Sequence, residues 1–156
     1  MAEVQTTSGR IPATRLGIVD AHEHLFGGPP SPFADQDPDL VLDSVEAALK
    51  ELDDFARAGG QTLVDATAID YGRNTQVLVE VSKRTPVKVV ACTGFNKGRF
   101  HPAWVRDESA DSLAEFMVKE VLEGIDDSGI KAGLLKTGSW YNVISPEERK
   151  VTIAVA

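Results

Sequence analysis

Short apolar segments rich in β-branched residues alternate along the chain with longer segments whose apolar residues recur every three or four positions. The first pattern predicts buried strands, and the second predicts amphipathic helices. Strands are predicted over residues 16–20, 61–67, 87–95 and 129–138. Helices are predicted over residues 40–58, 74–85 and 111–125, and a further helix is predicted to begin at Pro146. The chain therefore contains about four strand–helix units.

Residues at the predicted helix ends support these assignments. Asp39 is the expected N-cap of the first long helix, and Gly59-Gly60 would end that helix. Ser145 is the expected N-cap of the last helix, with Pro146 at its first position and two glutamates in its first turn.

Strands that alternate with helices imply an α/β fold with parallel strands and right-handed crossovers. Periodicity alone fits both an open doubly wound sheet and a (β/α) barrel. No strand is followed by a glycine-rich phosphate loop, which disfavours a nucleotide-binding sheet. A complete barrel needs about 200 residues or more. We therefore expect residues 1–156 to be a single domain: a compact four-stranded domain or a TIM-barrel-type half-barrel. Residues 1–15 are expected to be an extended N-terminal segment.

Composition narrows the class of protein. The formal net charge of −8 argues against binding to nucleic acid, and no apolar run has the roughly 18–20 residues that a membrane span needs. The N-terminal residues lack the apolar core of a signal peptide. Cys92 is the only cysteine, so an intrachain disulfide is impossible and a cytoplasmic location is expected.

Two histidines, His22 and His24, follow the first predicted strand in the stretch "GIVDAHEHL". Residues i and i+2 of a strand point to the same face, so both imidazoles project together from its C-terminal end. Neutral imidazoles are good ligands for zinc and related divalent metals, and Asp20 or Glu23 is a candidate acceptor behind them. Alternatively, both histidines are polar residues bonded to backbone at a strand end.

Lys136 ends the fourth predicted strand, in "GIKAGLLKTG", and looks buried between apolar neighbours. A buried ammonium is costly unless it is paired or chemically changed. Carboxylation by carbon dioxide would turn this lysine into an anionic oxygen donor able to bridge two metals. On this feature alone, a lysine that reaches solvent or pairs with an acid is the favoured interpretation.

Together these segments resemble the phosphotriesterase-like branch of the amidohydrolase superfamily. The resemblance is collinear from Gly17 to the last residue and rests on "DAHEHL", "TLVDAT" with "GRN", "TGF" and "GIKAGLLKTG" before "SPEER". It implies a (β/α)-barrel hydrolase with two divalent metal ions, most often zinc, with manganese or cobalt as alternatives. It also implies that His22 and His24 bind the more buried metal and that a carboxylated Lys136 bridges the two. A metal-activated hydroxide would then attack a phosphorus or carbonyl centre.

The resemblance also implies groups that this sequence does not contain. Further histidines from strands five and six and the catalytic aspartate from strand eight would lie beyond Ala156. The third histidine, His101, matches no expected ligand. We therefore expect the N-terminal half of such an enzyme, incomplete as this chain.

A lactone or other carboxylic ester is the expected substrate, ahead of a phosphoester. Lys97 and Arg99, in the loop after the third strand, are expected to engage an anionic group of the substrate. The alternative is a solvated basic loop. Arg73 is expected to have a structural role.

Two alternatives have a different function. A TatD-like nuclease also begins with D-x-H-x-H, but Lys136 stands where that family would have a glutamate, and the acidic charge disfavours DNA. A non-catalytic half-barrel would pair with a copy of itself or with a partner, because its first and fourth strands would be exposed edges.

Overall fold

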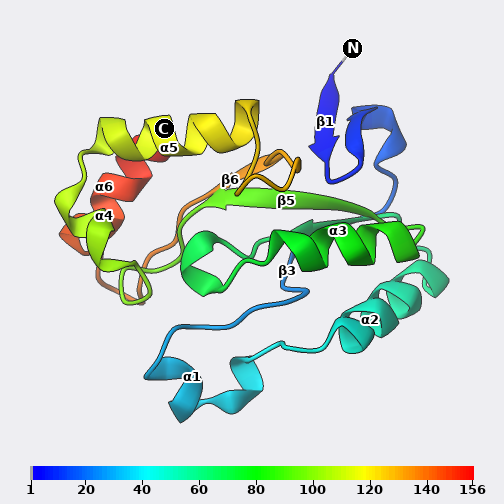
Figure 1. Ribbon diagram of the computed structural model, residues 1–156, viewed down its shortest axis with the longest axis horizontal. Helices are drawn as coiled ribbons and strands as arrows, with labels where there is room; N and C mark the ends of the chain where they lie inside the picture. The colour runs from blue at the N-terminus through cyan, green and yellow to red at the C-terminus, as the bar shows by residue number, and fades with distance from the viewer. Residues whose placement is uncertain (1) are drawn as a thin grey trace.

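A computed structural model describes residues 2–156 and shows a parallel four-stranded sheet with a helix after each strand (Figure 1). The strand order is β3-β4-β5-β6, which is also their order along the chain. The strands are β3 (Val19–Glu23), β4 (Thr62–Asp65), β5 (Lys88–Gly94) and β6 (Leu134–Lys136). The long helices are α2 (Val45–Arg57), α3 (Thr75–Arg84), α5 (Ala110–Leu122) and α6 (Pro146–Val155). The predicted α/β fold with four βα units is confirmed.

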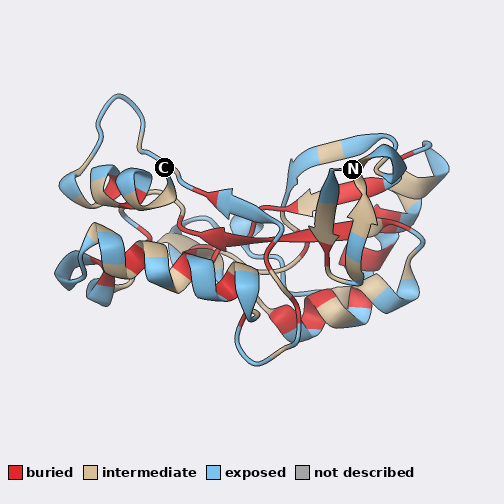
Figure 2. Ribbon diagram, turned by 90° about the horizontal axis from the view of Figure 1, so that it is seen from above, coloured by how far each residue is buried: buried red, intermediate tan, exposed pale blue. Residues whose placement is uncertain are grey.

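The core lies between the sheet and the helices, and Figure 2 shows buried residues along the middle strands and on one side of the long helices. Leu52 of α2, Val81 of α3 and Val89 of β5 belong to one buried cluster. A second cluster joins Phe95, Leu113 of α5 and Val151 of α6 beyond the end of β5. Burying such side chains is the main favourable term in folding, at roughly 1.5–3 kcal/mol each.

The N-cap of α2 is Ser44, so the prediction of Asp39 was wrong. The Ser44 side chain accepts a hydrogen bond from the Ala47 N–H at 3.2 Å. Asp39 lies instead in a separate 3-10 helix, Pro38–Leu40, and Val41 after it is extended. Leu42 then exchanges two backbone hydrogen bonds with Gly27, at 2.7 and 2.8 Å. The helix therefore begins only after this bridge.

The fourth predicted strand is much shorter than expected, because only Leu134–Lys136 pair with β5. Before it, the backbone N–H of Ala132 donates to Glu120 of α5 instead. Leu134 and Leu135 are 39% and 43% exposed, so the expectation of a strand with buried flanks was wrong for these two residues. They belong to an edge strand, since within residues 2–156 no strand of the sheet pairs with the outer side of β6.

Three kinds of element were not foreseen. The N-terminal residues form a hairpin of β1 (Glu3–Thr6) and β2 (Gly9–Pro12), followed by a short 3-10 helix. The Thr7 N–H donates to Val89 O at 2.8 Å, which fastens the hairpin to the start of β5. The other two are the short helices α1 (Phe33–Gln36) and α4 (Ala103–Asp107). No helix among residues 2–156 is long and apolar enough to cross a membrane.

Candidate metal centre

The two histidines lie at the C-terminal end of β3. Their ring centroids are 5.4 Å apart and the rings meet edge to face. The candidate acceptors behind them, Asp20 and Glu23, do not contact the rings. Their carboxylates instead accept from the backbone N–H groups of His22, at 3.2 Å, and His24, at 2.8 Å. Asp20 and Glu23 therefore cap local backbone N–H groups and do not orient the imidazoles as expected.

Lys136 lies beside these histidines. Its Nζ is 3.4 Å from His22 Nε2 and donates to Ala66 O at 2.7 Å. The residue is 9% exposed, and none of the ion pairs found among residues 2–156 includes it. The interpretations as a solvent-reaching or acid-paired lysine therefore do not describe it. Burial lowers the pKa of Lys136 from the ordinary value of a lysine.

A close approach of two strands fixes the place of Lys136. The Phe95 N–H donates to Lys136 O at 3.1 Å, directly after β5. Gly94 has φ of +105°, and a Cβ there would lie 2.1 Å from Lys136 O. Glycine is therefore required at this position of the "TGF" segment.

His24 is held in the form that binds metals. Burial, together with the charges of Lys136 and His22, lowers the pKa of His24 to about 4, so its imidazole is neutral at neutral pH. His24 Nδ1 lies 3.0 Å from Thr67 Oγ1, and the His24 ring packs 4.8 Å from the ring of Tyr71.

These residues fit a metal ion under one chemical condition. No group of three or more His, Cys, Asp or Glu side chains able to hold a metal occurs within the described residues. Two imidazoles and an ammonium are not a ligand set, because an ammonium has no lone pair to share. A carboxylated Lys136 would add anionic oxygens beside His22, and the lowered pKa eases access to the neutral amine, which is the form that reacts with carbon dioxide. The side chains present fit a metal only in that form.

The predicted anion-binding residues lie apart from this group. Lys97 Nζ is 4.5 Å and Arg99 Cζ is 4.3 Å from the centroid of the Trp140 ring. Lys97 Nζ also lies 4.6 Å from the centroid of Phe100. Phe100 packs on Tyr71, which in turn packs on His24, so a row of rings joins the basic loop to the histidines. Arg99 also lines a pocket of about 460 Å³ beside this loop.

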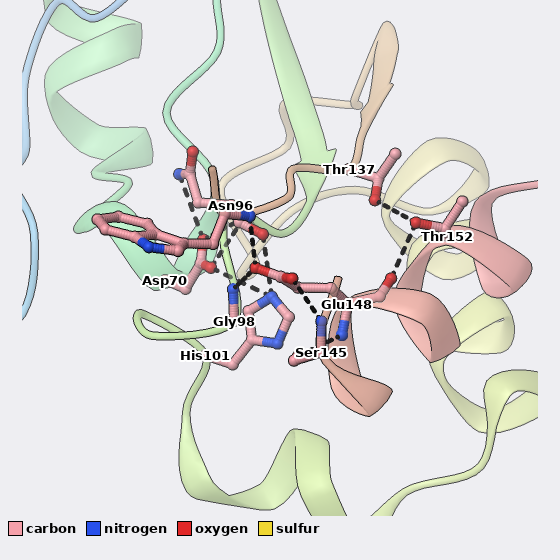
Figure 3. Close-up of polar contacts among 9 residues, drawn as sticks. Asp70, Asn96, Gly98, His101, Thr137, Ser145, Glu148 and Thr152 are labelled. Atoms are coloured by element: carbon pink, nitrogen blue, oxygen red, sulfur yellow. Dashed lines mark hydrogen bonds and ion pairs between the residues drawn. The ribbon is translucent and has the colours of Figure 1, made fainter. Parts of the chain in front are cut away.

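Buried carboxylates hold the basic loop in place, as Figure 3 shows. Glu148, which is 1% exposed, accepts backbone N–H bonds from Gly98 at 2.7 Å, Trp140 at 2.9 Å and Ser145 at 2.8 Å. Burial alone would raise the pKa of Glu148, but these three bonds outweigh it and lower the pKa. One side chain of α6 therefore joins the loop after β5 to the loop after β6.

Asp70 supports the same loop from the β4 side. Both of its carboxylate oxygens accept from the Asn96 N–H, at 2.9 and 2.8 Å. His101 lies in this network, with Nε2 at 3.0 Å from Asn96 O and 3.9 Å from Asp70 Oδ2. The third histidine is therefore bonded under the loop.

Sequence reasoning missed Thr67, Asp70 and Glu148 as residues of the site. The sequence placed Glu148 in the first turn of the last helix, where its side chain completes a capping box with Ser145. Its bonds to the two distant loops could not be read from that pattern. Arg73 has the structural role expected, because its side chain is 1% exposed and donates twice to Glu120, at 2.8 and 2.6 Å.

Fold and site together define a class of protein: half of a (β/α) barrel with imidazoles and a buried lysine at the C-terminal ends of its outer strands. The chain belongs to the phosphotriesterase family, whose family model matches residues 2–156.

Individual relatives support this assignment. A phospho-furanose lactonase of Mycoplasmopsis agalactiae is 33% identical, over 94% of this chain and 46% of the lactonase. The crystal structure of a lactonase from Listeria monocytogenes superposes with a TM-score of 0.90 at 35% identity, covering 99% of this chain and 52% of that one. The phosphotriesterase homology protein of Escherichia coli, complexed with phosphate in its active site, gives a TM-score of 0.83 at 34% identity, over 90% and 48% of the two chains. The predicted half-barrel is thereby confirmed, and the chain spans about half the length of the relatives it matches.

Proposed function

We propose that this chain supplies the N-terminal part of a binuclear, zinc-dependent hydrolase site that acts on lactones or other carboxylic esters, with phosphoesters as the second substrate class. One observation carries the proposal: His22, His24 and Lys136 meet at the C-terminal ends of β3 and β6, although Lys136 lies 112 positions after His24 in the sequence. The lactonases among the relatives favour the carboxylic ester. The family membership gives the nuclease alternative no support.

The metals, when bound, supply an activated hydroxide and stabilise negative charge on the attacked oxygen. His22 and His24 would hold the more buried ion, and a carboxylated Lys136 would reach both. Tyr71, packed on His24, limits the motion of that ring. We also propose a cytoplasmic location, because the only cysteine, Cys92, is a buried free thiol.

Metal content tests the site. We expect the purified chain to retain zinc in near-stoichiometric amount by inductively coupled plasma mass spectrometry, and His22→Ala and Lys136→Ala to lose it. Lys119→Ala on α5 and His101→Asn under the basic loop are the matched controls and should keep the metal. Carbon-13 bicarbonate should give a carbamate signal in the wild type that Lys136→Ala lacks. A folded wild-type chain without zinc contradicts the proposal that this half builds a metal site by itself.

We further propose that Lys97 and Arg99 bind an anionic group of the substrate, such as a phosphate. Their stacking on Trp140 keeps both cations at one place on the loop, which supports the proposal. The phosphate in the E. coli relative's active site is compatible with an anionic substrate group.

In a catalytically complete protein that contains this chain, we expect Lys97→Ala with Arg99→Ala to raise KM for a phosphorylated lactone roughly tenfold or more, with kcat and the KM for an uncharged lactone nearly unchanged. Lys83→Ala at the end of α3 serves as the control. Equal KM values for both lactones in the double variant would reject the anion site and favour the solvated loop.

A further inference from the structure

A buried aspartate and threonine at the end of β4 form a chain of contacts that reaches His24. Asp65 and Thr67 are 1% and 2% exposed. Asp65 Oδ1 accepts from the Thr67 N–H at 2.7 Å, and Thr67 Oγ1 lies 3.0 Å from His24 Nδ1. The contacts therefore run from a buried carboxylate, through one threonine, to one imidazole nitrogen.

The chemistry of the three groups gives these contacts a direction. A carboxylate only accepts hydrogen bonds, and the Thr67 N–H already holds this residue against Asp65, so a Thr67 hydroxyl turned toward the carboxylate can only donate to it. Consistent with this, both the hydroxyl and the N–H of Thr67 act to lower the pKa of Asp65, against the burial that raises it. The lone pairs of Thr67 Oγ1 are then left to accept from His24 Nδ1–H.

The other neighbours of His24 offer Nδ1 no comparable partner. Asp20 and Glu23 bond to backbone N–H groups, as described above. Tyr71 and His22 meet the His24 ring through ring contacts, with centroids at 4.8 and 5.4 Å. Thr67 is therefore the residue that decides which nitrogen of this imidazole carries the proton.

We propose that Thr67, oriented by Asp65, is a positioning residue that keeps His24 in the Nδ1–H tautomer and leaves Nε2 as the nitrogen free to bind a metal. That Nε2 binds a metal rests on the function proposed above. The assignment of the tautomer does not depend on that function. Partners of this kind behind a histidine fix both the orientation of the ring and its protonated nitrogen.

Nitrogen-15 long-range correlation spectra of the metal-free chain at neutral pH read the tautomer directly. His22→Asn and His101→Asn assign the three histidines. We expect Nδ1–H at His24 in the wild type and in Thr67→Ser, which keeps the hydroxyl. In Thr67→Val, which keeps the shape but not the hydroxyl, the proton should move toward Nε2. A wild type with Nε2–H, or a Thr67→Val spectrum identical to the wild type, overturns the proposal.

Zinc titration provides a second readout. Thr67→Val should weaken zinc binding on the order of 10–100-fold, while Thr67→Ser stays close to the wild type. If Thr67→Val fails to fold, Asp65→Asn removes the charged acceptor of the hydroxyl and should shift the tautomer in the same direction. If the tautomer shifts as expected in Thr67→Val but the wild type binds no zinc, the role of Thr67 is supported and the proposed metal site is not. If the wild type binds zinc but Thr67→Val has the wild-type tautomer, the metal site is supported and the role of Thr67 is rejected.

Discussion

At the scale of single residues, two carboxyl groups that are buried near the C-terminal ends of the strands, Asp65 and Asp70, have raised pKa values. Burial raises the pKa of Asp70 to about 6, from an ordinary value of 3.8, and the bonds from Asn96 and the nearby His101 only partly offset this. Burial likewise raises the pKa of Asp65 to about 6. The folded chain therefore holds these protons more tightly than the unfolded chain does.

This difference predicts a pH dependence of stability. As the pH rises from about 4 to about 6, the unfolded chain loses the Asp70 proton first, so folding becomes less favourable by up to about 3 kcal/mol. We expect Asp70→Asn to remove about half of the decline that the two carboxyls cause together. Urea denaturation at several pH values between 4 and 7 measures it. Equal slopes for the wild type and the variant would show that Asp70 does not titrate in this range.

At the scale of elements, sequence patterns succeeded where the signal was local. Ser145 and Pro146 predicted the start of α6, and Gly59-Gly60 closely predicted the end of α2, because caps depend on residues within one turn. Asp39 failed as a cap because it lies in a separate 3-10 helix, and a bridge between Leu42 and Gly27, which is distant in sequence, interrupts the chain before α2.

The site divides in the same way. The i, i+2 spacing of His22 and His24 was readable, and the resemblance to a family supplied Lys136. The roles of Thr67 and Asp70 could not be predicted from the sequence, because they depend on partners 43 and 26 residues away. No periodicity or motif in one sequence encodes such a contact.

The join between the two loops depends on the charge of Glu148. Glu148→Gln replaces one accepting oxygen with an NH₂ group that would face a backbone N–H, so we expect a loss of about 2–3 kcal/mol in the free energy of unfolding. Glu147→Gln, its neighbour in the first turn of α6, should change little. Guanidinium unfolding curves measure both. A Glu148→Gln variant as stable as Glu147→Gln would show that the three bonds contribute no net stability.

At the scale of the whole molecule, the sheet has two open edges. β3 and β6 each have one neighbour, and apolar residues next to or on them are exposed, with Ile18 at 61% and Leu135 at 43%. Unpaired strand edges of this kind invite pairing with another chain.

We therefore predict that the 156-residue chain self-associates. Light scattering coupled to size-exclusion chromatography should find dimers or larger species in the wild type. Ile18→Lys with Leu135→Lys should shift the population toward the monomer. Val118→Lys, which replaces an apolar residue 51% exposed on α5, is the control and should not. A wild type that stays monomeric at high concentration would contradict the role of the edges and the self-associating half-barrel.

The N-terminal hairpin meets the sheet at the start of β5, whereas the histidines and Lys136 lie where β3 and β6 end. In Figure 1 the β1 arrow of the hairpin accordingly lies above the right-hand half of the β5 arrow, away from the tip of β5. A chain tethered to a sensor surface by its N-terminal residues would thus present the face that carries His22, His24 and Lys136 outward. The same attachment point suits fusion partners, which would sit at the far end of the strands from these three residues.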